Sequence, residues 1–101
     1  MKIGLYAVFD TASGVYDGPI PMQSDAVALR NFRGVVQNAE HPIAQNPEDF
    51  SLIRIGEWND ATGEVVNHTN VTLITGLEVV AEMRNVVPIN DDVNLEDIVD
   101  A

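Results

Sequence analysis

Four side chains that could bind nucleic acid stand at alternating positions in two predicted strands. In the segments 2–9 and 50–58 they are Lys2, Tyr6, Arg54 and Trp58. Because alternate residues of a strand point to the same face of a sheet, we expect these four to share the outer face. Cations beside aromatic rings can hold phosphates and stack bases, and each stacked base contributes about 1–3 kcal/mol. The same pattern fits a contact surface between subunits, so that alternative stays open. The opposite face, which we expect to pack against a helix, consists of Ile3, Leu5, Phe9, Ile53 and Ile55.

A second pair of cations lies in a predicted helix that begins after Ser24. Arg30 and Arg33 are about one helical turn apart, so they could add a small positive spot to the same nucleic-acid site. The alternative is an ordinary solvated helix face. The candidate nucleic-acid-binding residues are therefore Lys2, Tyr6, Arg30, Arg33, Arg54 and Trp58.

Residues for catalysis or metal binding are lacking in this sequence. The chain has no cysteine, and its two histidines, His41 and His68, are not set in a recognisable catalytic motif. Neither a nucleophile elbow nor a phosphate-binding loop occurs. Two Asx-rich turns resemble calcium loops, but Ala12 and Ala61 interrupt their oxygen ligands. We expect no enzymatic activity, no cofactor and no metal site.

The elements that must position these side chains can be predicted from local patterns. Asp10–Gly14 and Asn59–Gly63 share the same turn chemistry, and each lies between two segments typical of strands. This predicts two β-hairpins, 2–9 with 15–22 and 50–58 with 64–72. Ser24 is a good helix N-cap, and an apolar stripe at helical spacing follows it. The stripe consists of Ala28, Leu29, Phe32, Val35 and Val36. We expect an α+β fold, an antiparallel sheet from two hairpins flanking one central helix, with closure into a small barrel as an alternative. Residues 77–84 fit either a short helix or a last strand.

Composition and charge limit the possible partners. The 101 residues include 16 acidic and five cationic side chains, which gives a net charge of −11. Nucleic-acid affinity comes largely from neutralising phosphates, so DNA binding would require a confined basic patch. We predict one domain over residues 1–89 and an acidic tail over residues 90–101. The tail could bind a partner protein through Asp91, Asp92, Leu95, Glu96, Asp97 and Ile98. The sequence contains no apolar stretch long enough to span a membrane and no signal peptide, which favours a cytosolic protein.

The order and spacing of several motifs between Ile3 and Val66 resemble the small nonstructural protein of gokushoviruses, single-stranded DNA phages of the Microviridae. The block 46–63 carries most of this resemblance. The other matching parts include Tyr6, Asp10, Gly14-Val15-Tyr16, Pro19-Ile20-Pro21, Ala28, Arg30, Phe32 and His41-Pro42.

The resemblance implies a non-enzymatic accessory role in viral DNA replication, in the cytoplasm of the bacterial host, at the stage that makes single-stranded progeny DNA. Two mechanisms are compatible with it. In the first, a homo-oligomer gathers the cations and aromatic rings into a groove for single-stranded DNA, and the acidic tail competes with DNA or recruits phage or host replication proteins. In the second, the protein is an acidic adaptor for the replication initiator or the procapsid and does not touch DNA. We expect the first.

Overall fold

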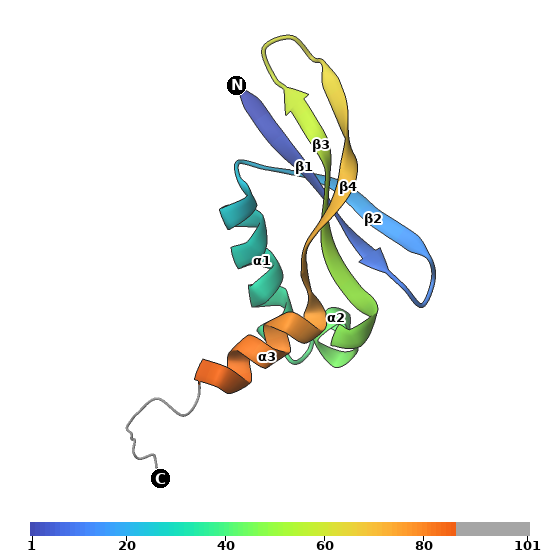
Figure 1. Cartoon of the computed structure of the whole chain (residues 1–101), viewed down its shortest axis with the longest axis vertical. Coiled ribbons are helices and arrows are strands. Elements are labelled where there is room, and N and C mark those ends of the chain that lie inside the picture. Colours follow the sequence, from blue (N-terminus) through green and yellow to red (C-terminus); the bar gives the residue numbers. More distant parts are fainter. Residues whose placement is uncertain (87–101) are drawn as a thin grey trace.

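The computed structural model describes residues 1–86 (Figure 1). The predicted acidic tail, with its candidate partner-binding residues, lies outside the described residues. In chain order the elements are β1 (Lys2–Asp10), β2 (Val15–Met22), α1 (Asp25–Gln37), α2 (Pro42–Gln45), the 3-10 turn η1 (Pro47–Asp49), β3 (Phe50–Asn59), β4 (Val65–Thr75) and α3 (Gly76–Val86). None of the helices in this part of the chain is long and apolar enough to cross a membrane.

The four strands form one antiparallel sheet in the order β2-β1-β3-β4. The predicted α+β class is confirmed. Within residues 1–86, β2 and β4 are the two edges and no ladder joins them, so the barrel alternative is wrong. Two residues of β2, Pro19 and Pro21, have no N–H to donate, and proline is found in sheets mainly on such edge strands.

The two hairpin turns have the same hydrogen bonds, as their sequences predict. Asp10 accepts from the Ala12 N–H at 3.0 Å, and Asn59 accepts from the Ala61 N–H at 2.9 Å. Gly14 and Gly63 close the turns with φ values of 74° and 78°, which glycine adopts without steric cost. Local turn chemistry therefore fixes both hairpins.

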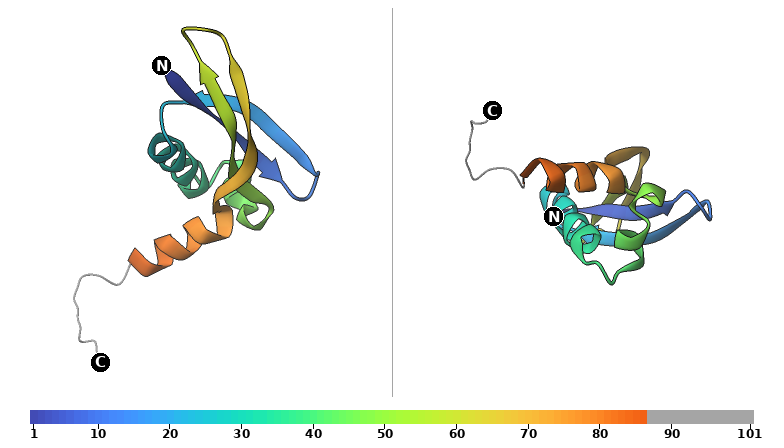
Figure 2. Two further views of the ribbon diagram at one scale, coloured as in Figure 1. Left: turned by 45° about the horizontal axis from the view of Figure 1, so that its top comes forward. Right: turned by 90° about the horizontal axis from the view of Figure 1, so that it is seen from below.

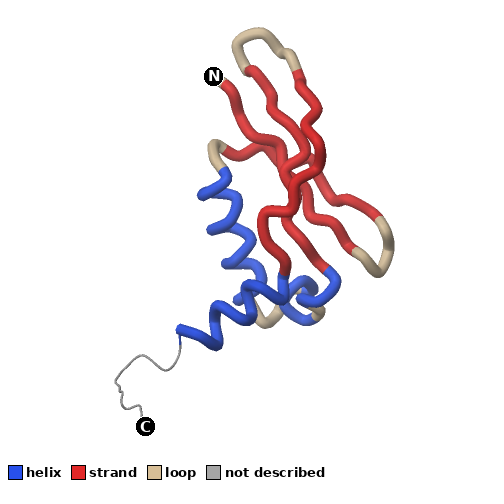
Figure 3. Tube along the Cα trace, in the orientation of Figure 1, coloured by secondary structure: helices blue, strands red, loops and turns tan. Residues whose placement is uncertain are grey.

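Helices cover one face of the sheet, in the lower half of the view in Figure 3. Ser24 caps α1, accepting from the Val27 N–H at 3.2 Å. The buried cluster that joins this helix to the sheet comprises Tyr6, Ala28, Phe32, Val36, Leu52, Ile74 and Val79. Val79 belongs to α3, so two helices, α1 and α3, pack into the core, whereas the sequence predicted one central helix. Figure 2 shows α1 and α3 gathered beside the sheet when it is seen from below.

An extra residue in β3 changes the faces on which its side chains lie. Tyr6 is opposite Arg54, whereas Leu5 is opposite Gly56, so Ile55 has no counterpart in β1. Such a β-bulge reverses the alternation of every residue beyond it. Trp58 lies opposite Ile3, on the other face from Arg54 and Tyr6. The prediction that Lys2, Tyr6, Arg54 and Trp58 share one face is wrong. So is the prediction that the Ile3, Leu5, Phe9, Ile53 and Ile55 face packs on the helix.

Candidate functional site

Tyr6 is part of the hydrophobic core. Its side chain is only 1% exposed, and its hydroxyl donates a hydrogen bond of 2.6 Å to Asp25 Oδ1 at the start of α1. Burial, together with this hydrogen bond, raises the pKa of Tyr6 to about 12. A ring enclosed in this way cannot stack on a base, so the predicted exposed position of Tyr6 is wrong.

Arg54 is neutralised by the same carboxylate. Its Nη1 atom lies 3.0 Å from Asp25 Oδ2, and the Arg54 side chain is about one-third exposed (35%). The depression beside this pair has a volume of about 410 Å³ and also contains Lys2 and Glu57. Two cations therefore meet two carboxylates there. A phosphate group entering this depression would find no net positive charge.

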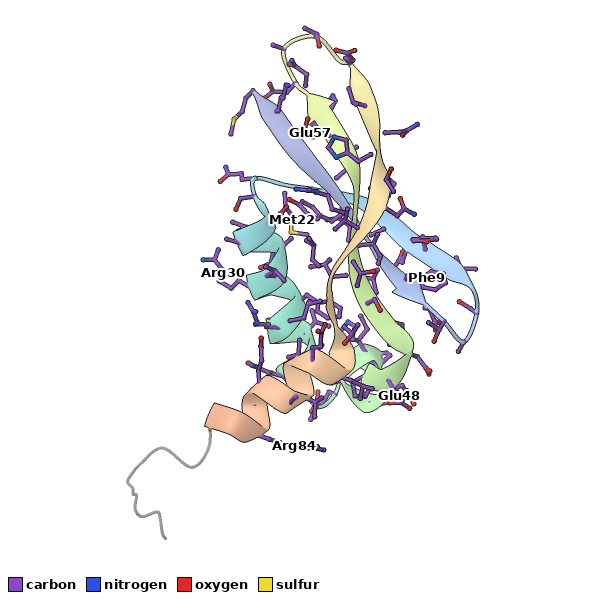
Figure 4. All side chains as sticks on the ribbon, in the orientation of Figure 1. Phe9, Met22, Arg30, Glu48, Glu57 and Arg84 are labelled. Carbon is purple, nitrogen blue, oxygen red and sulfur yellow. The ribbon has the colours of Figure 1, made fainter. Side chains whose placement is uncertain are left out.

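The two arginines of α1 do not add a basic patch. Arg33 pairs with Glu82 of α3, with Nε 2.9 Å from Oε1 and Nη2 3.2 Å from Oε2. Arg30 points away from the sheet on the outer side of α1 (Figure 4). Among the described residues no carboxylate lies within ion-pair distance of Lys2 or Arg30. The six predicted DNA-binding residues are thus not brought together at one surface.

The opposite, helix-free face of the sheet is apolar as well. Its cross-strand pairs include Ile3 with Trp58, and Phe9 with Tyr16, whose ring centroids are 4.6 Å apart. An antiparallel sheet with one face on the core usually carries polar side chains on the other. Here the two central strands present apolar side chains on the second face as well.

A groove of about 440 Å³ runs along this helix-free face. Its floor is formed by Leu5, Ala7, Ile55 and Gly56 of the two central strands. Its walls come from the two edge strands, with Tyr16, Gly18 and Pro19 on β2 and Val65, Asn67, His68 and Asn70 on β4. The lining contains no Asp, Glu, Lys or Arg. For a chain with a net charge of −11, a groove without charged side chains is an unusual surface.

The curvature of the sheet brings the two walls together. Asn70 of β4 donates a hydrogen bond of 3.3 Å to the Tyr16 hydroxyl of β2, although the two strands are opposite edges. Irregular pairing around Ile55 and Gly56 contributes to this shape, because β-bulges increase local twist. Gly56 is required here, since a Cβ atom would collide with the Val66 carbonyl oxygen. This groove was not predicted from the sequence, because Leu5 and Ile55 of its floor were assigned to the face that packs on the helix.

The two histidines belong to different elements, α2 and β4. His41 Nδ1 accepts from the Ile43 N–H at 3.1 Å and so caps α2. His68 Nε2 lies 3.8 Å from Glu57 Oε1, at one wall of the groove. Within residues 1–86 there is no cluster of three or more side chains that could hold a metal ion.

Comparison with known proteins assigns the chain to a family. The family model described as "Phage ORF5 protein" matches residues 3–79, which is more than half of the chain. The chain belongs to the Phage ORF5 protein family. It is therefore a phage protein. No curated protein and no solved structure gives a significant match.

The region shared with the Phage ORF5 protein family contains the whole groove. The lining residues run from Leu5 to Asn70, inside the matched residues 3–79. The match ends at Val79, the α3 residue that completes the buried core. The groove and the core beneath it thus belong to the part of the chain that the family describes.

Proposed function

We propose that this phage protein is a non-enzymatic accessory factor that acts as an acidic protein–protein adaptor in viral DNA replication. The replication role rests on the resemblance to the gokushovirus nonstructural protein, and places the protein in the cytoplasm of the bacterial host. The adaptor mechanism rests on one observation, the apolar, uncharged groove on the helix-free face. This reverses our expectation from the sequence, in which direct DNA binding was the first mechanism.

Electrostatics favour the adaptor over a DNA-binding protein. Two of the arginines that the sequence predicted to bind DNA, Arg33 and Arg54, are held by Glu82 and Asp25. A net charge of −11 repels a polyanion unless a basic patch offsets it. An apolar contact with a protein needs no such patch.

Single-stranded DNA is the second candidate, because three aromatic side chains lie on the helix-free face. Phe9, Tyr16 and Trp58 could offer rings to unpaired bases. The phosphates would then have to be neutralised by cations outside the groove, such as Lys2. Self-association, expected from the sequence, stays a prediction for either mechanism.

Fluorescence anisotropy of a labelled single-stranded oligonucleotide separates the two candidates. An adaptor should give no saturable binding even at low salt. A DNA-binding protein should bind at low salt and lose affinity steeply as salt rises, because released counterions drive the binding. Salt-sensitive binding that Trp58→Ala abolishes would refute the adaptor and establish the DNA mechanism.

A further inference from the structure

The floor of the groove on the helix-free face offers no side chain for hydrogen bonding. Leu5, Ala7 and Ile55 are aliphatic, and the groove volume of about 440 Å³ lies within the range of sites that enclose ligands. A polar or charged group placed on this floor would lose its water without gaining a partner. The part of a ligand that enters the groove must therefore be apolar.

Neutral polar side chains on the β4 wall have free hydrogen-bonding capacity. Asn67, His68 and Asn70 line this wall. Among residues 1–86 the single hydrogen bond of these three side chains joins the Asn70 amide to the Tyr16 hydroxyl over 3.3 Å. The carbonyl oxygen of Asn70 and the whole amide of Asn67 are thus free to bond a ligand. A carboxamide presents both donors and an acceptor, which match the acceptor and donor of a peptide group.

These wall amides distinguish an extended peptide from other ligands. In a helix the backbone N–H and C=O groups bond one another, whereas an extended segment leaves them free and directs alternate side chains to one face. Such a segment can bond Asn67 and Asn70 with its backbone while alternate side chains enter the groove. A nucleic-acid strand would instead bring phosphates to a lining without lysine or arginine.

We infer that the groove binds an extended segment of a partner protein, whose inserted side chains are apolar and uncharged and whose backbone is bonded by Asn67 and Asn70. A lysine or a glutamate in the inserted segment would find no opposite charge, because the lining contains no Asp, Glu, Lys or Arg. Either side chain would lose its hydration without compensation. This inference rests on the proposed adaptor function and specifies the part of the partner that the adaptor holds.

Two adjacent valines of β4 provide a matched pair of variants. Val65 lines the groove and is 59% exposed, whereas Val66 lies opposite Glu57 on the other face and is 44% exposed. Val65→Glu and Val66→Glu therefore introduce the same charge on the same strand, on opposite faces. An effect of charge on the whole molecule should be equal in both variants, and only an effect of the groove should differ. A third variant, Asn67→Leu, keeps a side chain of similar size at the exposed wall and removes its amide.

The test is an NMR titration of the full chain with short synthetic peptides. The neutral peptide has a Leu-Ile-Val centre between serines, and two charged peptides have lysine or glutamate in place of the isoleucine. A further peptide has the neutral sequence with N-methylated backbone amides. We expect the neutral peptide to bind in the groove and each charged peptide to bind at least about tenfold more weakly. The N-methylated peptide should bind about threefold to tenfold more weakly, because its backbone has lost the donors for the wall amides.

The variants locate the binding and separate its two parts. Val65→Glu should weaken the neutral peptide at least about tenfold, because a carboxylate would enter an apolar site, and Val66→Glu should leave its affinity unchanged. Asn67→Leu should weaken the neutral peptide about threefold to tenfold. The same substitution should affect the N-methylated peptide less, because part of the interaction with Asn67 is already absent there.

Other outcomes overturn the inference in distinguishable ways. Binding of no peptide, equal or tighter binding of a charged one, or equal binding of the N-methylated one would contradict the proposed partner chemistry and leave the adaptor function standing. Binding of a single-stranded oligonucleotide that Val65→Glu abolishes would refute the adaptor as well, because the groove would then be a nucleic-acid site. A dimer, measured by sedimentation, that Val65→Glu dissociates would make a second copy of the chain the occupant in place of a partner protein.

Discussion

Replacing Tyr6 by phenylalanine tests whether this ring belongs to the core. The substitution keeps the aromatic ring but removes the hydroxyl that donates to Asp25 over 2.6 Å. The carboxylate acceptor remains beside Arg54, whose Nη1 atom is 3.0 Å from its Oδ2. One hydrogen bond to a charged group is thus lost, while the packing of the ring is retained.

The expected loss of stability follows from the surroundings of the acceptor. Hydrogen bonds to charged groups contribute about 1.5–3 kcal/mol. The Asp25 side chain is 40% exposed, so water can partly replace the phenol, and the lower end of that range applies. We expect Tyr6→Phe to lower the free energy of unfolding by about 1.5 kcal/mol. For a domain of this size that corresponds to a fall in Tm of roughly 6–12 °C.

Urea unfolding monitored by circular dichroism measures this loss, with Tyr16→Phe as the control. The Tyr16 side chain is 47% exposed and its hydroxyl receives one bond from Asn70 at 3.3 Å, so the control should change stability by less than about 0.5 kcal/mol. If Tyr6 lay on an exposed face, as the sequence pattern suggested, Tyr6→Phe would be as neutral as the control. Equal, small effects of the two substitutions would refute the structural assignment of Tyr6.

Three further predictions concern stability. In urea unfolding, Gly4→Ala should lower the free energy of unfolding by about 1–3 kcal/mol, because the new Cβ would collide with the buried Tyr6 ring. Gly34→Ala, on the exposed side of α1, should raise the free energy of unfolding by about 0.4–1 kcal/mol. Thr75→Ala removes the N-cap of α3, and we expect thermal unfolding to show a loss of about 1 kcal/mol. The folded state raises the pKa of Tyr6 from 10.0 to about 12. The protonated phenol of Tyr6 therefore contributes fully to the free energy of unfolding below pH 10, and this contribution is lost between pH 10 and 12. The Tyr16→Phe variant contains Tyr6 as its single tyrosine, so tyrosinate absorbance during an alkaline titration measures the ionisation of Tyr6 alone. Ionisation of Tyr6 near pH 10 in the folded state would contradict this prediction.

Local chemistry allowed much of the fold to be predicted from the sequence. The two turns depend on Asx side chains and on glycines at fixed spacing, so both hairpins could be located from these residues alone. The N-cap at Ser24 and the apolar stripe that follows it located α1 for the same reason. A signal for α3 was also present. Thr75 and Glu78 form a capping box, in which each side chain accepts from the other's backbone N–H, at 3.1 and 2.8 Å.

The faces of the sheet could not be predicted, because they depend on pairing between distant residues. Ile55 reads as an ordinary member of an alternating strand, and only its pairing with β1 shows that it is an extra residue. Beyond it, Trp58 changes face, and the predicted cluster of cations and aromatic rings separates. The ion pairs of Arg54 with Asp25 and of Arg33 with Glu82 join segments that are far apart in the sequence. The candidate DNA site was therefore predicted from correct strands but from an incorrect register.

The proposed function depends on the groove being occupied by a protein, and site-specific photo-crosslinking in infected cells tests this most directly. A photo-reactive phenylalanine analogue would replace Val65, which lines the groove, or Val66, which lies on the other face. We predict a protease-sensitive, nuclease-resistant protein adduct from position 65 and little or none from position 66. A nuclease-sensitive adduct from position 65, or equal protein adducts from both positions, would contradict the proposal.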